Sequence, residues 1–197
     1  MSNIITTQNS LETLAKSMTA GSLRALVSAR KKNAVVLLDT SASMSESIGG
    51  GGPMKITQLR EVAATLREMS PNVPFIAFHG AVAQVVEAIP DPSGNTPLAK
   101  AINYAKQLGA QHAVVISDGE PNDTWAAREA ARNFGGQIDT FFVGNPHSFG
   151  AQFLQEIADL TGGKSNVTDL GQPKQLGQKI AGMLGDGKPV EKEAIQL

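Results

Sequence analysis

Three oxygen-bearing side chains, Asp39, Ser41 and Ser43, follow directly on an apolar run that begins at Val35. A run of this length predicts a strand buried on both faces, so these side chains should lie at its C-terminal end. In open α/β sheets, ligands bind at that end of the strands. One carboxylate and two hydroxyls on one side of a turn form an all-oxygen cluster, which suits a small divalent cation such as Mg²⁺ or Mn²⁺.

Two later segments offer further oxygen ligands. Thr96 comes just before a predicted helix, and Asp118 ends a second apolar run. Each residue also has an ordinary interpretation: Asp39 as the cap of a turn, Thr96 as the N-cap of a helix with Pro97 in its first position, and Asp118-Gly119 as a turn. Their occurrence together and in this order favours a metal site.

With these three segments the chain resembles the von Willebrand factor A (vWA) family, which includes integrin inserted domains and many bacterial proteins. The metal-ion-dependent adhesion site of that family has the pattern Asp-x-Ser-x-Ser, then a distant Thr and a distant Asp. All five positions match here: Asp39, Ser41, Ser43, Thr96 and Asp118. A lone Asp-x-Ser-x-Ser would be weak evidence, but three separated motifs in the right order are specific. The resemblance covers roughly residues 33–185.

The resemblance implies a set of ligand roles. Ser41 and Ser43 would bind the ion directly, Thr96 would give a third hydroxyl that can engage or release, and Asp39 and Asp118 would bind the ion or hold its waters. The implied cofactor is Mg²⁺, with Mn²⁺ or Ca²⁺ as alternatives. Since few carboxylates bind directly, the ion would keep positive charge and take an Asp or Glu from a partner protein.

The elements that must position these residues alternate along the chain. Strands are predicted at 33–39, 73–79, 82–89, 112–118, 138–143 and 165–169, and helices at 56–69, 97–109, 123–134, 149–161 and 173–184. Such alternation predicts an α/β fold with a mainly parallel sheet covered on both faces. Only Gly80 and Ala81 separate the second and third strands, so these two must form a hairpin with an antiparallel edge strand. The vWA fold has the same doubly wound, six-stranded arrangement, with one reversed edge strand.

The composition of the chain argues against several classes of binding and chemistry. The 197-residue chain is 41% hydrophobic and 18% charged, carries a formal net charge of −1 and contains no cysteine. Its charge gives no general attraction for nucleic acid or anionic membranes, and disulfides and thiolate sites are excluded. No signal peptide or membrane-spanning run is evident, so we expect a cytoplasmic protein. Before and after the vWA region, we expect a helical extension at 1–32 and a polar tail at 186–197.

Loops around the predicted site should set its specificity. They are residues 44–54, which include a run of four glycines, residues 90–95 and residues 120–123. We expect Glu46 and Glu120 to be solvated and Asp123 to cap the following helix. Trp125 is expected to pack, although an exposed Trp at this place would suit an interface. His79 is expected to be a partly buried structural residue.

The leading hypothesis is a metal-dependent protein-binding module, not an enzyme, from a bacterial or phage intracellular system. Bacterial vWA proteins often work beside AAA+ ATPases of the MoxR or chelatase kind, which makes such an ATPase a candidate partner. The alternative is a Mg²⁺-dependent phosphoryl-transfer enzyme with Asp39 as nucleophile. Phosphatases of the haloacid dehalogenase type need a second Asp two residues later, where this chain has Ser41. A third possibility is a structural component of a homo-oligomeric particle, assembled through the N-terminal helices.

Overall fold

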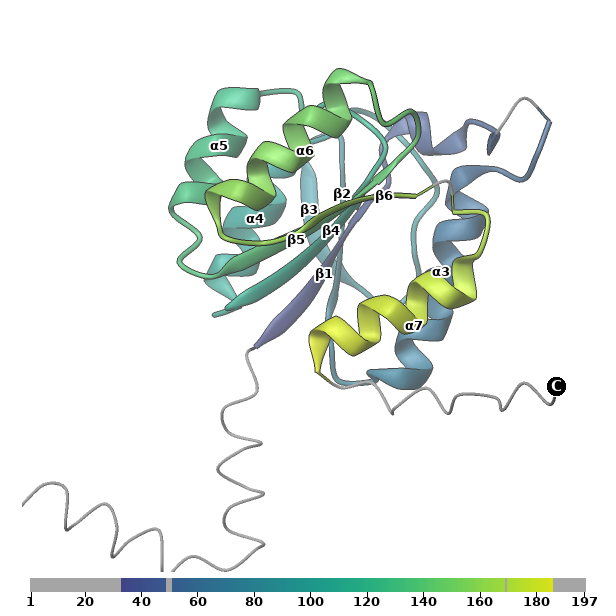
Figure 1. Cartoon of the computed structure of the whole chain (residues 1–197), viewed down its shortest axis with the longest axis horizontal. Coiled ribbons are helices and arrows are strands. Elements are labelled where there is room, and N and C mark those ends of the chain that lie inside the picture. Colours follow the sequence, from purple (N-terminus) through teal and green to yellow (C-terminus); the bar gives the residue numbers. More distant parts are fainter. Residues whose placement is uncertain (1–32, 49–50, 169, 186–197) are drawn as a thin grey trace, which may run out of the picture. The chain divides into compact units, whose positions relative to one another are not determined.

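Strands and helices alternate through the part of the chain that the computed structural model describes, residues 33–48, 51–168 and 170–185 (Figure 1). The strands are β1 (Ala34–Asp39), β2 (Phe75–His79), β3 (Val82–Val86), β4 (His112–Ser117), β5 (Gln137–Val143) and β6 (Ser165–Thr168). The helices are η1 (Ala42–Ser45), α3 (Lys55–Met69), α4 (Leu98–Gln107), α5 (Thr124–Arg132), α6 (Phe149–Leu160) and α7 (Pro173–Leu184). The predicted N-terminal extension and C-terminal tail lie outside the described residues.

The strands form one six-stranded sheet in the order β3-β2-β1-β4-β5-β6. All neighbouring pairs are parallel except β2 and β3, which pair antiparallel from Phe75 opposite Val86 to His79 opposite Val82. The hairpin follows from the short connection at Gly80-Ala81, and the parallel pairs from the helical crossovers. The predicted α/β class, with one reversed edge strand, is confirmed.

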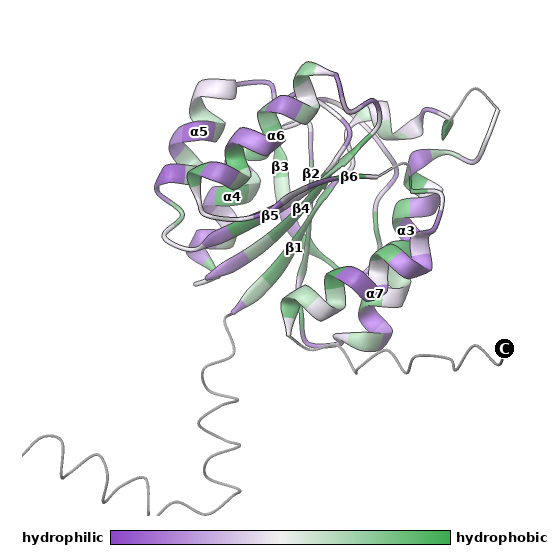
Figure 2. Ribbon diagram, viewed as in Figure 1, coloured by the Kyte–Doolittle hydropathy of each residue, from purple (hydrophilic) through white to green (hydrophobic). Residues whose placement is uncertain are grey.

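Helices cover both faces of the sheet because the central strands are apolar on both sides. In β1 and β4 every residue after Ala34 is buried, and Figure 2 shows β1 largely green while the helices carry both colours. One hydrophobic cluster joins one face of the sheet to α4, α5 and α6, and another joins the opposite face to α3 and α7. The two helical layers lie on opposite sides of the sheet in Figure 1.

Strand β3 is shorter than the predicted 82–89. It ends at Val86, opposite the first residue of β2, Phe75. Beyond that point its partner would be Pro74, which has no N–H to donate and whose carbonyl accepts from the Val36 amide instead. Pairing therefore stops where the neighbouring strand runs out of hydrogen-bonding groups.

The strand order reverses between β1 and β4. From β1 the chain moves to β2 and β3 on one side, and it returns through α4 to β4 on the other side. In open α/β sheets such a switch point opens a crevice at the carboxyl ends of the two strands. Asp39 is the last residue of β1, and Asp118 directly follows β4. The fold thus brings two segments about 80 residues apart to one edge of the sheet.

None of the helices in the described segments has the length and apolar character needed to cross a bilayer.

Candidate metal centre

Asp39 is fully buried at the end of β1 and organises the turn that follows. Its Oδ1 accepts from the Ser41 amide at 2.8 Å, and its Oδ2 accepts from the Ser117 hydroxyl at 2.5 Å. Burial raises the pKa of Asp39 to about 6, although the hydrogen bonds from Ser117 and Ser41 oppose this rise. A nearby divalent cation would lower this pKa, because its positive charge stabilises the ionised carboxylate of Asp39.

Ser41, Ser43 and Asp118 form a continuous chain of oxygens beside Asp39. The hydroxyls of Ser41 and Ser43 lie 3.1 Å apart, and the Ser43 hydroxyl donates to Asp118 Oδ1 at 2.8 Å. The predicted turn takes the form of a short 3₁₀ helix, η1, and the two hydroxyls lie close enough to hydrogen-bond. The Met44 amide donates to the Ser41 carbonyl and closes this turn.

Thr96 reaches the same place from the loop before α4. A Cβ built on Gly119 would lie 3.7 Å from Thr96 Oγ1 and 3.8 Å from Ser43 Oγ, so these two hydroxyls flank the space that Gly119 leaves open. The backbone of Thr96 is held on both sides by Asn122: the Thr96 amide donates to Asn122 Oδ1 at 2.6 Å, and the Asn122 amide donates to the Thr96 carbonyl at 3.1 Å.

The alternative interpretation of Thr96, as the N-cap of the following helix, is wrong. Helix α4 begins at Leu98, and its N-cap is Pro97, with no side-chain capping bond. Pro97 has φ −81° and ψ 58°, which keeps it out of the helix. The Thr96 hydroxyl is therefore not used to start the helix.

The donor set fits a small hard cation. Adjacent oxygen ligands of an octahedral Mg²⁺ lie about 3 Å apart, given bonds of about 2.1 Å. The separations of 3.1 Å between the serine hydroxyls and 2.8 Å between Ser43 and Asp118 are of that size. Among the described residues, no group of three or more His, Cys, Asp or Glu is placed to hold a metal. A metal at this site would therefore depend on hydroxyl ligands beside the single carboxylate of Asp118.

Lys55 belongs to the site, and the sequence analysis missed it. Its Nζ donates to Asp118 Oδ2 at 2.6 Å and to Glu46 Oε2 at 2.8 Å, while its side chain is 14% exposed. Partial burial by itself would lower the pKa of Lys55, but the hydrogen bonds to Asp118 and Glu46 outweigh it and raise the pKa above its ordinary value. Asn122 and Ser117 were also missed as positioning residues.

A weak signal was present in the sequence, because Lys55 directly precedes the helix predicted at 56–69. Lys55 is the first residue of α3, where the helix dipole disfavours a positive charge, and the first turn contains no acidic residue. A lysine at this place needs a nearby anion. Only the folded chain shows that the anion is Asp118.

The loop at 90–95 is held firmly at the edge of the sheet. The Ser93 amide donates to the Thr40 carbonyl, the Ala42 amide to Gly94, and the Gly80 amide to Asn95. Gly94 has φ +62°, and a Cβ there would lie 2.7 Å from Gly80 Cα, so the close approach of these two turns requires glycine. His79 ends β2, and its Nδ1 lies 2.9 Å from the Ser93 hydroxyl.

Other expectations about the surrounding loops had mixed outcomes. Asp123 caps α5, as predicted, because its side chain accepts from the Ala126 amide at 2.8 Å. Glu120 is exposed. Glu46 is not merely solvated, since it pairs with Lys55. The expected packing of Trp125 is wrong: it is 70% exposed at the start of α5.

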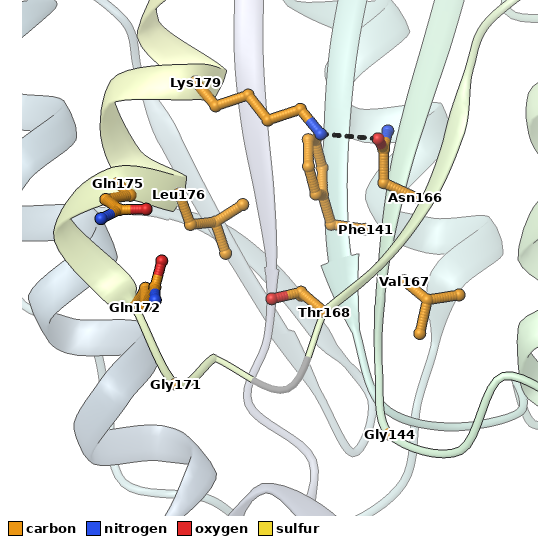
Figure 3. Close-up of a pocket in the computed structure, with 10 residues that line it drawn as sticks. All are labelled: Phe141, Gly144, Asn166, Val167, Thr168, Gly171, Gln172, Gln175, Leu176 and Lys179. Atoms are coloured by element: carbon orange, nitrogen blue, oxygen red, sulfur yellow. Dashed lines mark hydrogen bonds between the residues drawn. The ribbon is translucent and has the colours of Figure 1, made fainter.

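Two cavities lie near the carboxyl ends of the strands. The smaller, about 330 Å³, adjoins the oxygen cluster and is lined by Lys55, Asp118, Gly119 and the start of α6. The larger, about 890 Å³, lies between β5, β6 and α7 (Figure 3). There Lys179 donates to Asn166 at 2.8 Å above the Phe141 ring. The described residues that line the larger cavity include amides, a hydroxyl and a lysine but no carboxylate.

No family model matches the chain, and no curated protein matches it. Among solved structures it is similar to a von Willebrand factor type A protein from Catenulispora acidiphila, with a TM-score of 0.57 and 18% sequence identity. The match covers 77% of this chain and 41% of that one. At this identity the likeness shows the fold, which is the Rossmann-like fold of vWA domains. The predicted fold class is thereby confirmed, while the ligand roles of the five residues stay predictions.

Proposed function

We propose that this chain is a metal-dependent protein-binding module. Ser41, Ser43, Thr96 and Asp118 would hold the ion, and Asp39 would fix the turn that presents the two serines. When bound, Mg²⁺ would supply a positive charge that retains attraction for an anionic oxygen from outside the chain. A carboxylate of a partner protein is the anion that this arrangement suits.

The observation that supports this proposal most directly is the packing of oxygens at the switch point of the sheet. Two hydroxyls and a carboxylate lie at the separations of adjacent Mg²⁺ ligands, and a third hydroxyl flanks the open space at Gly119. Asp39 and Ser41 are buried, so they are held in place before any ligand arrives. Preorganisation of this kind reduces the free-energy cost of binding.

The surface beside the site suits a protein partner. Trp125, in the first turn of α5, is 70% exposed, and Phe149, the first residue of α6, is 51% exposed. Exposed aromatic residues are common anchors of protein interfaces. The 330 Å³ cavity beside Asp118 is large enough to admit an acidic side chain. A partner carboxylate in this cavity would be surrounded by Lys55, the turn at 118–120 and the segment that joins β5 to α6.

The burial of Asp39 argues against the alternative of a phosphoryl-transfer enzyme. A nucleophile must reach a phosphorus atom in line, whereas both oxygens of Asp39 are hydrogen-bonded and its side chain is inaccessible. A screen of phosphate esters with Mg²⁺ tests this directly. Robust turnover that is lost in Asp39→Asn would favour the enzyme and overturn the binding module.

The proposed setting rests on the resemblance to bacterial vWA proteins. It is a cytoplasmic adaptor or assembly role, with an AAA+ ATPase of the MoxR kind as the partner to test first. Affinity capture on the full chain should be run in Mg²⁺ and in EDTA, with Asp39→Ala as control. A partner retained equally in EDTA would contradict metal-dependent binding.

The metal itself is tested by calorimetric titration of Mg²⁺ and Mn²⁺ into the full chain. Wild type should bind one ion, and Ser41→Ala/Ser43→Ala should abolish binding while leaving the circular dichroism spectrum unchanged. Mg²⁺ should also raise the Tm of wild type, because an ion that binds only the folded state stabilises it. Equal binding by the double variant would place the metal elsewhere.

A further inference from the structure

The ammonium of Lys55 lies among the oxygens of the candidate metal site. It donates to Asp118 Oδ2 at 2.6 Å and lies 3.5 Å from the Ser43 carbonyl. The other oxygen of Asp118 accepts from the Ser43 hydroxyl at 2.8 Å. Both oxygens of Asp118 are therefore engaged by groups of the chain itself.

A lysine and a divalent ion would compete for this carboxylate. Two positive charges a few Å apart repel strongly where solvent is partly excluded, and the side chain of Asp118 is only 1% exposed. An Asp118 shared with Lys55 also offers less negative charge to an ion. Lys55 therefore satisfies the buried acid in the absence of metal, and its charge would oppose the binding of a cation there.

The structure also provides a way for Lys55 to leave. Its Nζ already contacts Glu46 at 2.8 Å, and the Glu46 side chain is 67% exposed. The 330 Å³ cavity, which Lys55 lines, offers space for a flexible side chain to move. The position at the start of α3 gives the ammonium no support from the helix dipole. Lys55 is thus held at Asp118 by the carboxylates and not by the helix.

We propose that Lys55 is a tethered counter-ion, which occupies Asp118 in the metal-free protein and swings to Glu46 when a divalent cation binds. The proposal rests on the metal-dependent module described above. Lys55 would then lower the affinity of the site for metal, although it is not one of the five residues of the matched pattern.

The test compares Lys55→Met with Arg67→Met in the full chain. Met keeps the length of the side chain but removes the charge, and Arg67 lies on the same helix, where it donates to the Val86 carbonyl away from the site. Calorimetric titration of Mn²⁺ should show Lys55→Met binding about tenfold more tightly than wild type, because a nearby repulsive charge is removed. Arg67→Met and the charge-retaining Lys55→Arg should bind close to wild type.

Thermal unfolding gives a second readout that a purely structural lysine would not produce. In EDTA, Lys55→Met should unfold at a lower Tm than wild type, because Asp118 loses its counter-ion. In saturating Mn²⁺ this deficit should disappear or reverse. A deficit of the same size in EDTA and in Mn²⁺ would mean that Lys55 is structural, and it would overturn the proposal.

Other outcomes separate this inference from its premise. Equal Mn²⁺ affinity in wild type and Lys55→Met, or weaker affinity in the variant, refutes the competition while leaving the metal site intact. Absence of Mn²⁺ binding in wild type and in Lys55→Met refutes the metal-dependent module itself, and the counter-ion role with it.

Discussion

A buried carboxylate lies near each end of strand β4, and the two carboxylates differ in which groups donate hydrogen bonds to them. At its start, His112 contacts Asp139 of β5 at 2.7 Å, and Asp139 also accepts from Gln137 Nε2 and the Lys164 amide. After its end, Asp118 is bound by the Ser43 hydroxyl and by Lys55. The first carboxylate is surrounded by donors from the sheet and its connections, and the second by a hydroxyl and a flexible side chain.

This difference indicates that Asp139 has a structural role and that Asp118 is available for a ligand. The donors to Asp139 are two side chains on β4 and β5 and a backbone amide, so nothing around it can be exchanged without disturbing the sheet. The donors to Asp118 come from a turn and from the first residue of a helix, and one of them has a second, exposed partner in Glu46. A buried acid whose donors can leave is a place where a ligand can enter.

The largest effect is expected at the rigid end. Asp139→Ala should lower the free energy of unfolding by about 3–5 kcal/mol, because it leaves buried donors without a partner. Urea denaturation measures this loss. If the variant is folded at the start of the thermal melt, its Tm should still rise when Mg²⁺ is added. A loss below about 1 kcal/mol would mean that the Asp139 network is less important than its burial indicates.

The same carboxylate should contribute to the loss of stability in acid. Burial alone would raise the pKa of Asp139, but hydrogen bonds from Gln137, His112 and the Lys164 amide hold it below the ordinary value of 3.8. Its stabilising contribution is therefore complete above the ordinary pKa and is lost as pH falls through the lower folded pKa. Below about pH 4, wild type should lose more stability per pH unit than Asp139→Asn, which cannot titrate. Parallel acid limbs in urea titrations would contradict this.

At the exchangeable end, Asp118→Asn should cost only about 1 kcal/mol, because Lys55 keeps Glu46 as a partner and can extend toward solvent. Its response to metal should change far more: the Mg²⁺-induced rise in Tm should vanish. If Asp118→Asn instead destabilised the chain as much as Asp139→Ala does, the contrast between the two ends of β4 would fail.

The smallest effect on folding is expected for Gly119→Ala. The added methyl would lie 3.7–3.8 Å from Thr96 Oγ1 and Ser43 Oγ, which is ordinary contact, so stability should change by less than about 1 kcal/mol. The methyl would fill space between the hydroxyls and should weaken Mn²⁺ binding in a calorimetric titration. Unchanged affinity would show that the ion does not use this space.

Most of the fold could be predicted because the signals are local. Apolar runs at β1 and β4 and the helical periodicity of α3 and α6 come from neighbouring residues, and the two-residue gap at Gly80-Ala81 decides the hairpin. The end of β3 could not be predicted in this way, since it depends on what its neighbour, β2, can offer beyond Phe75.

The candidate site was predictable only where its residues lie on a known pattern. Asp39, Ser41, Ser43, Thr96 and Asp118 converge at one edge of the sheet, as expected, and their use as metal ligands stays a prediction. Lys55 and Asn122 were missed because their partners are 63 and 26 residues away in the sequence. Contacts of that kind follow from the completed fold: the place of Lys55 at a helix start favours a nearby anion but does not identify which one.

The two hydrogen bonds between Thr96 and Asn122 fasten one loop to another. These loops cannot diverge independently, because a change in the length or course of either one would pull on the other. Related sequences should therefore vary the two segments as a unit, while the described residues of the segment at 44–54 make no hydrogen bond to Thr96 and are freer to change. Diversification of partners would then begin in that first loop.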